Sequence, residues 1–123
     1  SILSASKIKA ATSFIFEHYK TLNTFFYMIV IIVGYAWCPH YHHAIAVLNN
    51  YPQYLMPVRK RRAEGKKELL HKIQAVTLDK TPLGKVVGET SPQVFVRYQD
   101  IVYCLGGDDD VTRNKTLINR YFI

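Results

Sequence analysis

The most apolar stretch of this chain is Phe25-Phe-Tyr-Met-Ile-Val-Ile-Ile-Val-Gly-Tyr-Ala-Trp37. It lies in a longer window, from Thr21 to Val58, that contains no Asp, Glu, Lys or Arg. The run is apolar on every side of a helix, and such a helix has to be buried in protein or in lipid. Because a chain of 123 residues has little protein with which to surround a helix, the run favours burial in lipid.

We therefore predict a transmembrane helix over residues 21–38. A helix of that length is about 27 Å long, which fits a thin bilayer. Aromatic residues gather at membrane interfaces, and we assign four of them to that position: Tyr27, Tyr35, Trp37 and Tyr41. The alternative is a buried helix or strand of a soluble β-rich domain, because Ile-Val-Ile-Ile-Val is also a strong strand pattern.

The segments on either side complete the predicted architecture. Residues 1–20 form an N-terminal helical segment that continues into the span, and Pro39 ends that long helix. Residues 39–58 contain Asn and Pro breakers and form a connecting segment, and residues 59–123 form an extrinsic part. The predicted fold class is thus a single-span transmembrane α-helix with a small α+β extrinsic C-terminal part.

The extrinsic part is predicted to begin with a basic helix over Arg59–Gln74, where opposite charges recur at helical spacing. After it, turn residues separate short runs that are rich in β-branched and aromatic residues. These runs predict strands at 75–78, 85–87, 93–98 and 101–105. Asp110 is the candidate N-cap of a last helix over 111–123.

Positive charge is concentrated in one place. The formal net charge is +7, and much of it comes from six residues that we call the basic cluster: Arg59, Lys60, Arg61, Arg62, Lys66 and Lys67. Such a cluster implies phosphate nearby, in lipid headgroups or in nucleic acid. Beside a membrane span, we predict that it faces anionic headgroups. Basic flanks stay on the side of insertion, so the C-terminal part is predicted to lie on the matrix side.

Two short motifs carry groups that suit metal ions. The run Cys38-Pro-His-Tyr-His-His43 holds thiol and imidazole ligands for zinc, copper or haem iron, but its spacing matches no metal motif. The run Gly106-Gly-Asp-Asp-Asp110 has consecutive acids, whereas calcium loops alternate theirs. It predicts a turn before a helix N-terminus, where carboxylates are favourable. We therefore predict no metal, no cofactor and no catalytic residue.

The general layout resembles that of small single-span accessory subunits of mitochondrial respiratory complexes. The resemblance implies a non-catalytic accessory (supernumerary) subunit of a respiratory-chain complex or the ATP synthase, single-pass in the mitochondrial inner membrane. The expected partners are other subunits of that complex and anionic lipids, with no nucleic acid and no small-molecule substrate.

Two alternatives stay open at this point. One is a basic RNA-binding component of an organellar ribosome, in which the apolar run is a core element and the basic cluster faces phosphates. The other is a membrane metal- or haem-binding protein that uses Cys38–His43.

Overall fold

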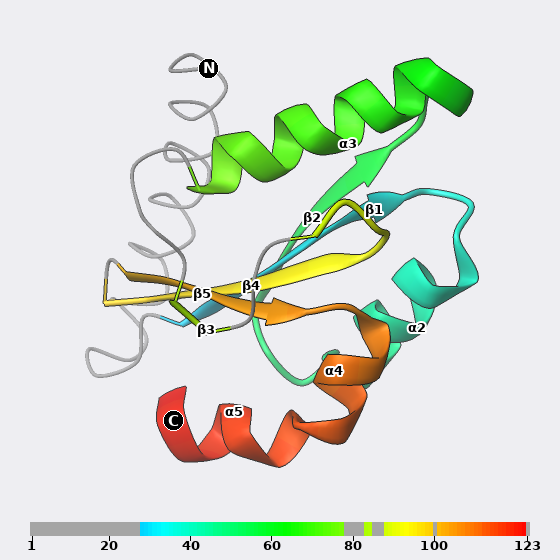
Figure 1. Cartoon of the computed structure of the whole chain (residues 1–123). Coiled ribbons are helices and arrows are strands. Elements are labelled where there is room, and N and C mark those ends of the chain that lie inside the picture. The colour runs from blue at the N-terminus through cyan, green and yellow to red at the C-terminus, as the bar shows by residue number, and fades with distance from the viewer. Residues whose placement is uncertain (1–27, 78–82, 85–87, 100, 123) are drawn as a thin grey trace.

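The computed structural model describes residues 28–77, 83–84, 88–99 and 101–122 of the chain (Figure 1). Its centre is a mixed sheet with the strand order β2-β1-β4-β5-β3. The strands are β1 (Ile29–Tyr35), β2 (Gln53–Val58), β3 (Leu83–Gly84), β4 (Gln93–Tyr98) and β5 (Ile101–Gly106). β1 is parallel to β2 and antiparallel to β4, while β5 is antiparallel to β4 and parallel to β3.

Helices cover both faces of this sheet (Figure 1). One face carries α3 (Arg62–Thr77), and the other carries α2 (Pro39–Val47), α4 (Asp108–Arg113) and α5 (Lys115–Phe122). α2 is the crossover between the parallel strands β1 and β2, a connection that a tight turn cannot make. The chain then forms the antiparallel pair β4 and β5 and ends with α4 and α5.

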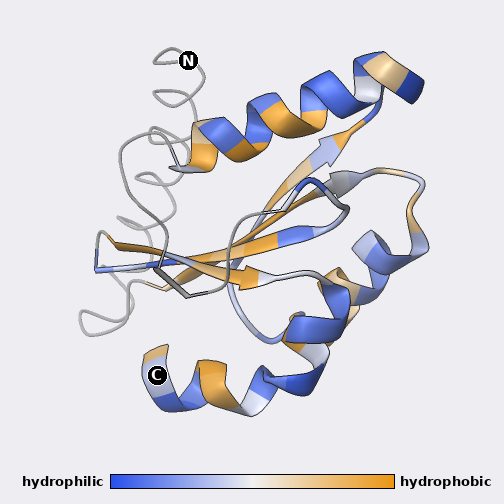
Figure 2. Ribbon diagram, viewed as in Figure 1, coloured by the Kyte–Doolittle hydropathy of each residue, from blue (hydrophilic) through white to orange (hydrophobic). Residues whose placement is uncertain are grey.

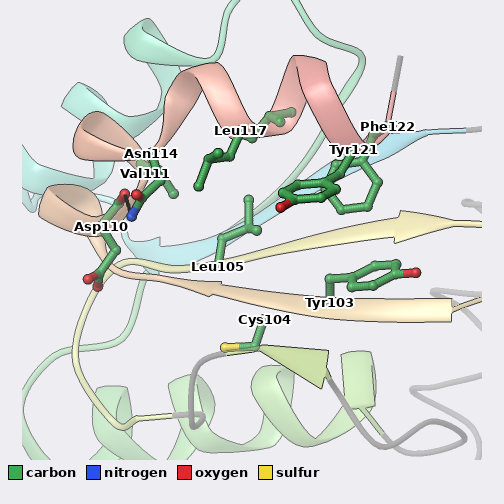
Figure 3. Close-up of a pocket in the computed structure, with 10 residues that line it drawn as sticks. Tyr103, Cys104, Leu105, Asp110, Val111, Asn114, Leu117, Tyr121 and Phe122 are labelled. Carbon is green, nitrogen blue, oxygen red and sulfur yellow. Dashed lines mark hydrogen bonds between the residues drawn. The ribbon is translucent and has the colours of Figure 1, made fainter.

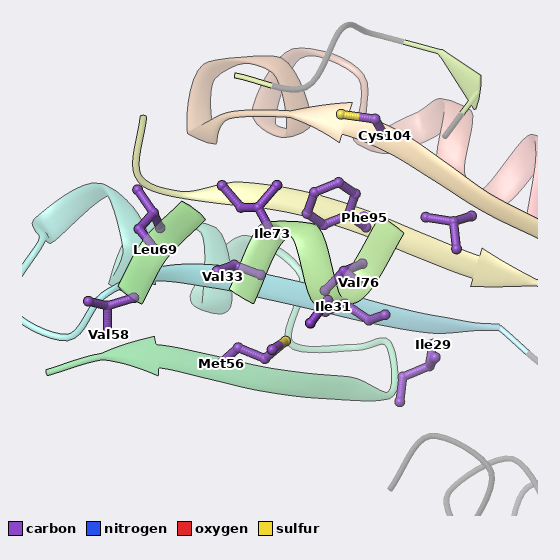
Figure 4. Packing of buried hydrophobic residues seen from close by; sticks show 12 residues of the cluster. Ile29, Ile31, Val33, Met56, Val58, Leu69, Ile73, Val76, Phe95 and Cys104 are labelled. Carbon is purple, nitrogen blue, oxygen red and sulfur yellow. The ribbon is translucent and has the colours of Figure 1, made fainter. Parts of the chain in front are cut away.

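β1 is buried on both of its faces. Residues 29–33 are all at most 1% exposed. Ile31 and Val33 belong to the core under α3, together with Ile73 (Figure 4). The alternate residues Val30 and Ile32 belong to the core under α2, α4 and α5. Hydropathy follows this layering, because the strands are largely apolar and the helices turn polar residues outward (Figure 2).

The predicted transmembrane helix over 21–38 is wrong. Residues 29–35 form a strand at the centre of the sheet, and the part of the prediction before residue 28 lies outside the described residues. No helix that the structure describes combines the length and apolar content needed to cross a membrane. The physical reason is that a strand covered on both faces is apolar at every position. Its sequence therefore shows the same unbroken apolar run as a helix buried in lipid.

Several of the helices and strands predicted after residue 58 agree with the structure. The basic helix is confirmed as α3, and two of the predicted strands are confirmed as β4 and β5. Residues 75–77 continue α3 instead of starting a strand, because Ala75 and Val76 extend the buried stripe of that helix. The strand at 85–87 and the helical segment at 1–20 lie outside the described residues.

Pro39 and Asp110, which both lie near helix starts, differ in position from the prediction. Pro39 begins α2 instead of ending a helix, because the first helical position needs no backbone N–H. The N-cap of α4 is Gly107, not Asp110. Asp110 instead accepts a hydrogen bond on Oδ2 from the Gly107 N–H at 2.9 Å. The expected turn before a helix N-terminus is confirmed at this position.

We expect Ile32→Ala to lower the free energy of unfolding by about 2–5 kcal/mol, because it removes buried methyl groups and leaves a cavity. Leu55→Ala is the matched control. Leu55 pairs with Ile32 in the β1–β2 ladder, yet it is 42% exposed while Ile32 is 0% exposed. Urea titration should show the control losing less than half as much stability, and equal losses would contradict burial of β1 on both faces.

Candidate functional site

The C-terminal ends of β1 and β2 meet at one edge of the sheet. Because these strands are parallel, Tyr35 at the end of β1 pairs with Val58 at the end of β2. The pairing extends one step further, since the Ala36 N–H donates to the Val58 carbonyl at 2.9 Å. The segments that follow both strands therefore start side by side. Trp37 and Cys38 follow β1, and the basic cluster follows β2.

Cys38 stands at the start of α2. It is the N-cap residue, with an extended backbone (φ −78°, ψ 122°), and Pro39 is the next residue. The Cys38 N–H donates to the Tyr35 carbonyl at 3.0 Å, and the Cys38 carbonyl accepts from the His42 N–H at 3.2 Å. The thiol is free and half-buried. Cys38 thus stands at the end of α2 that carries partial positive charge.

The loop before β4 closes the other side of the thiol. Cys38 Sγ lies 3.9 Å from the Ser91 carbonyl oxygen and donates to it. Ser91 Oγ in turn accepts a hydrogen bond from the Tyr35 N–H at 2.9 Å. Gly34 makes this convergence possible, since a Cβ there would lie 2.5 Å from Tyr41 Cδ1 and 2.7 Å from Ser91 Oγ.

An open polar groove of about 320 Å³ adjoins the thiol through Ser91. It runs between the loop before β4 and the turn from β5 into α4, with His40 of α2 also on its wall. The Ser91–Pro92 peptide bond on this wall is cis, and Gly106 has φ 99°, which a residue with a side chain rarely adopts. The buried Gln93 side chain braces the loop. Its Nε2 donates to the Thr90 carbonyl at 2.9 Å, and its Oε1 accepts from the Gly88 N–H at 3.2 Å.

Asp108, the first residue of α4, ties that helix to α2. It is only 8% exposed and accepts two hydrogen bonds from imidazole rings. His40 Nδ1 donates to Oδ2 at 3.1 Å, and His43 Nδ1 donates to Oδ1 at 2.6 Å. His42 Nε2 donates instead to the Ala36 carbonyl at 2.6 Å. The histidines of the Cys38–His43 run thus hold α2 in place, and no three ligating side chains in the described residues are grouped to hold a metal ion.

Tyr41 occupies the position where a C-x-x-C redox motif beginning at Cys38 would place its second cysteine. Its side chain is buried, and its ring meets the His42 ring edge-on at 5.4 Å. Burial raises the pKa of the Tyr41 phenol above its ordinary value of 10.0, and the positive charge of Arg59 partly opposes that shift. The phenol is therefore protonated at neutral pH.

The basic cluster lies on the same edge as the thiol, between the end of β2 and the first turns of α3, and all six of its side chains are exposed. The Arg61 guanidinium lies over the Trp37 ring, 4.2 Å from its centroid. Trp37 also stacks on Tyr35 at 4.9 Å. The assignment of this cluster to lipid headgroups stays a prediction.

The aromatic residues assigned to a membrane interface have other surroundings. Tyr41 is buried in the core under α2. Tyr35 packs against the core under α3, and Trp37 is 38% exposed beside Arg61. Tyr27 lies outside the described residues.

A second, mainly apolar hollow of about 590 Å³ lies between β5 and the C-terminal helices (Figure 3). Tyr103 and Leu105 face it from β5, and Tyr121 faces it from α5. Cys104 points to the opposite side of β5 (Figure 3), where it is 2% exposed in the core under α3. Cys38, by contrast, contacts Ser91, which lines the polar groove.

Sequence patterns did not reveal Ser91, Asp108 or Gly34 as parts of a site. Their roles depend on contacts between segments that are distant along the chain, such as the 53 residues that separate Cys38 from Ser91. One local signal for the thiol was present. A cysteine followed by proline, directly after a strand-like run, is placed at a helix N-terminus, where cysteines become reactive.

Comparisons with known proteins give a likeness in fold. No family model matches the sequence, and no curated protein matches it. The crystal structure of glutaredoxin 1 from Francisella tularensis complexed with cacodylate is similar, with a TM-score of 0.49 and 18% sequence identity, over 76% of this chain and 98% of that chain. The connectivity of this chain, a parallel β1-α2-β2 unit followed by α3, the β4–β5 pair and C-terminal helices, is an α+β arrangement.

The prediction of an accessory subunit in the mitochondrial inner membrane is therefore wrong. It depended on the span over 21–38, and residues 29–35 of that span are the central strand of this sheet. The single-pass location, with the C-terminal part on the matrix side, is wrong for the same reason.

We expect Gly34→Ala to lower the free energy of unfolding by about 1–3 kcal/mol, because its methyl group overlaps Tyr41 and Ser91. The same overlap should push α2 away from the loop and speed alkylation of Cys38 by iodoacetamide. Gly88→Ala is the control, since its Cβ would meet only the Gln93 side chain, at 3.4 Å or more. If both variants are equally stable and alkylated at the same rate, the close approach around Gly34 does not exist.

A second expectation concerns alkaline pH. The pKa of Tyr41 is raised in the folded protein, so the unfolded chain ionises first. The free energy of unfolding should therefore fall as pH rises from about 10 through the folded-state pKa. At lower pH the phenol is protonated in both the folded and the unfolded state, so ionisation of Tyr41 causes no such fall. Tyr41→Phe should reduce the fall, whereas Tyr121→Phe, at a side chain 64% exposed, should not. Urea titrations at about pH 9 and about pH 11 test this, and an unchanged fall in Tyr41→Phe would refute it.

Proposed function

We propose that this protein is a thiol–disulfide oxidoreductase that works with the single thiol of Cys38. One observation carries the proposal: a free, half-buried thiol at the N-terminus of α2 lies 3.9 Å from the carbonyl of Ser91, a residue that lines an open groove. The solved structure that resembles this chain is named a glutaredoxin. The proposal rests on the geometry of this chain and not on that likeness.

The surroundings of Cys38 suit a nucleophilic sulfur. The thiolate, not the thiol, attacks a disulfide. A thiolate here would face the N-terminus of α2, where partial positive charge stabilises anions. The exposed basic cluster begins one residue after Val58, on the neighbouring strand end, and adds positive charge on the same edge.

A single thiol determines the course of the exchange. The Cys38 thiolate attacks one sulfur of a substrate disulfide, a mixed disulfide forms at Cys38, and the other substrate sulfur leaves as a thiolate. Tyr41 stands where a resolving cysteine would be, and Cys104 is buried on the other side of the sheet. An external thiol must therefore attack the mixed disulfide. The sulfur of the external thiol forms a new disulfide with the substrate sulfur that was bound to Cys38, and Cys38 leaves as the thiolate. The external thiol is therefore the group that is oxidised.

The groove gives the substrate a place beside the sulfur. Its walls come from the loop before β4 and from the turn into α4, and they include Thr90, Gln93 and the three acidic residues Asp108, Asp109 and Asp110. Gly107 at this turn is in ordinary van der Waals contact with its surroundings, because a Cβ there would lie 3.6 Å from the Pro92 carbonyl oxygen and 3.8 Å from Asp110 Oδ2. Polar walls of this kind suit the amide groups of a peptide that carries the reacting sulfur.

The test uses bis(2-hydroxyethyl) disulfide, which is small and uncharged. We expect the wild-type protein to form a mixed disulfide at Cys38, identified by peptide mass, that dithiothreitol reverses. Cys38→Ser should form no adduct on the retained Cys104, and Cys104→Ala should react like the wild type because Cys104 is 2% exposed. Absence of the adduct on Cys38 in folded protein, or equal modification of Cys104, would reject the proposal.

A further inference from the structure

We propose that the basic cluster docks acidic protein segments and so selects the disulfides that reach Cys38. This inference rests on the function proposed above and specifies its substrate class. The partner it describes is a protein whose reacting cysteine is flanked by Asp or Glu. The cluster and the thiol lie on the same edge of the sheet because β1 and β2 are parallel and end together.

The charge of the cluster is largely uncompensated. Residues 59–67 contain six basic side chains and one acidic side chain, Glu64. Lys66 pairs with Glu89 at 3.7 Å. Within the part of the chain that the structure describes, the other five basic side chains form no ion pair with a carboxylate. A partner that supplies carboxylates would therefore meet exposed cations rather than displace existing pairs.

The backbone that presents these cations is firmly held. Glu68 Oε1 accepts hydrogen bonds from the backbone N–H groups of Arg59 and Lys60, each at 3.2 Å. The Lys60 carbonyl packs closely against Gly65, because a Cβ at that position would collide with it. Arg62 takes a left-handed conformation at the start of α3, with φ 57°. A surface ordered in this way loses less conformational entropy when a partner binds.

One contact connects the cluster to the residue beside the thiol. Arg61 lies over Trp37 at 4.2 Å, and Trp37 directly precedes Cys38. Burial raises the pKa of Tyr41 and the positive charge of Arg59 partly opposes that larger effect, and Tyr41 is three residues after Cys38. A carboxylate bound by Arg59 or Arg61 would consequently lie within a few residues of a sulfur that reacts with Cys38.

The same surroundings favour a protein over a nucleic acid or a membrane. Proteins that bind single strands offer aromatic rings on which bases stack, but the Trp37 ring is already engaged by Arg61 and Tyr35. Membrane-surface helices place large apolar side chains beside their cations. Here the exposed Leu55, Ile101, Leu117 and Tyr121 lie on β2, β5 and α5. Trp37, which is 38% exposed, does lie beside the cluster, but its ring is covered by Arg61.

The experiment compares three peptides, each holding one cysteine as a mixed disulfide with 2-mercaptoethanol and flanked by glutamate, glutamine or lysine. We expect the full chain to react with the glutamate peptide roughly 10-fold faster than with the lysine peptide at low salt, because charge complementarity raises association rates. The ratio should fall towards one in 0.5 M salt, where a Debye length of a few ångströms screens exposed charges.

Matched variants localise the effect. Lys60→Gln combined with Lys67→Gln removes two cluster charges, leaves the Arg61–Trp37 contact in place, and should reduce the ratio. Lys115→Gln combined with Arg120→Gln removes the same charge from α5 and should leave the ratio unchanged. Equal reduction by both pairs would show a general charge effect and overturn the docking site.

Two further outcomes separate the possible failures. If the wild type does not react with bis(2-hydroxyethyl) disulfide, the proposed function fails and this inference fails with it. If it reacts but shows no preference for the glutamate peptide, only this inference fails. Binding of a single-stranded RNA oligonucleotide or of phosphatidylserine vesicles, lost in the Lys60/Lys67 variant and without a glutamate preference, would assign the cluster to nucleic acid or lipid instead.

Discussion

The side chains of β1 pack alternately against α3 and against the helices on the opposite face, so this strand meets water on neither side. The placement of the helices on both faces of the sheet follows from that double burial. Two faces need two sets of covering helices, and a parallel neighbour needs a crossover, which α2 supplies. The same crossover begins directly after β1, so the helix that covers the strand also places Cys38 at its end.

This arrangement explains why the Cys38 thiol and the basic cluster lie at the same edge of the sheet. Parallel strands end together, and the turns that follow them carry the thiol from β1 and the cations from β2. The loop before β4 reaches the same edge because β4 runs antiparallel to β1 and therefore starts where β1 ends. Gly34 allows the three segments to approach closely. The position of the site thus follows from the directions of the strands, and the absence of a side chain at Gly34 allows the close contacts within it.

The sequence predicted the elements whose patterns are local. The charge pairs of α3 and the β-branched runs of β4 and β5 each identify their own structure, and all three were found. β1 was misread because its apolar run has no period, and a fully covered strand and a lipid-buried helix share that property. Pro39 is equally ambiguous, because a proline can follow the end of a helix or occupy its first turn, and here it begins α2. The contacts of Asp108 with His40, 68 residues earlier, have no local signature at all.

The burial of Cys104 beneath α3 has a consequence under oxidative stress. A peroxide that oxidises Cys38 produces a sulfenic acid, which in many proteins is quenched by a second cysteine of the same chain. Here the second sulfur lies in the core on the far side of the sheet, so no intramolecular disulfide can trap that species. Capping by a thiol from solution is the route that remains reversible, and without it the sulfur proceeds to sulfinic acid and is lost as a nucleophile. In the thiol-exchange function proposed above, the supply of free thiol around the protein would therefore set how long Cys38 stays active.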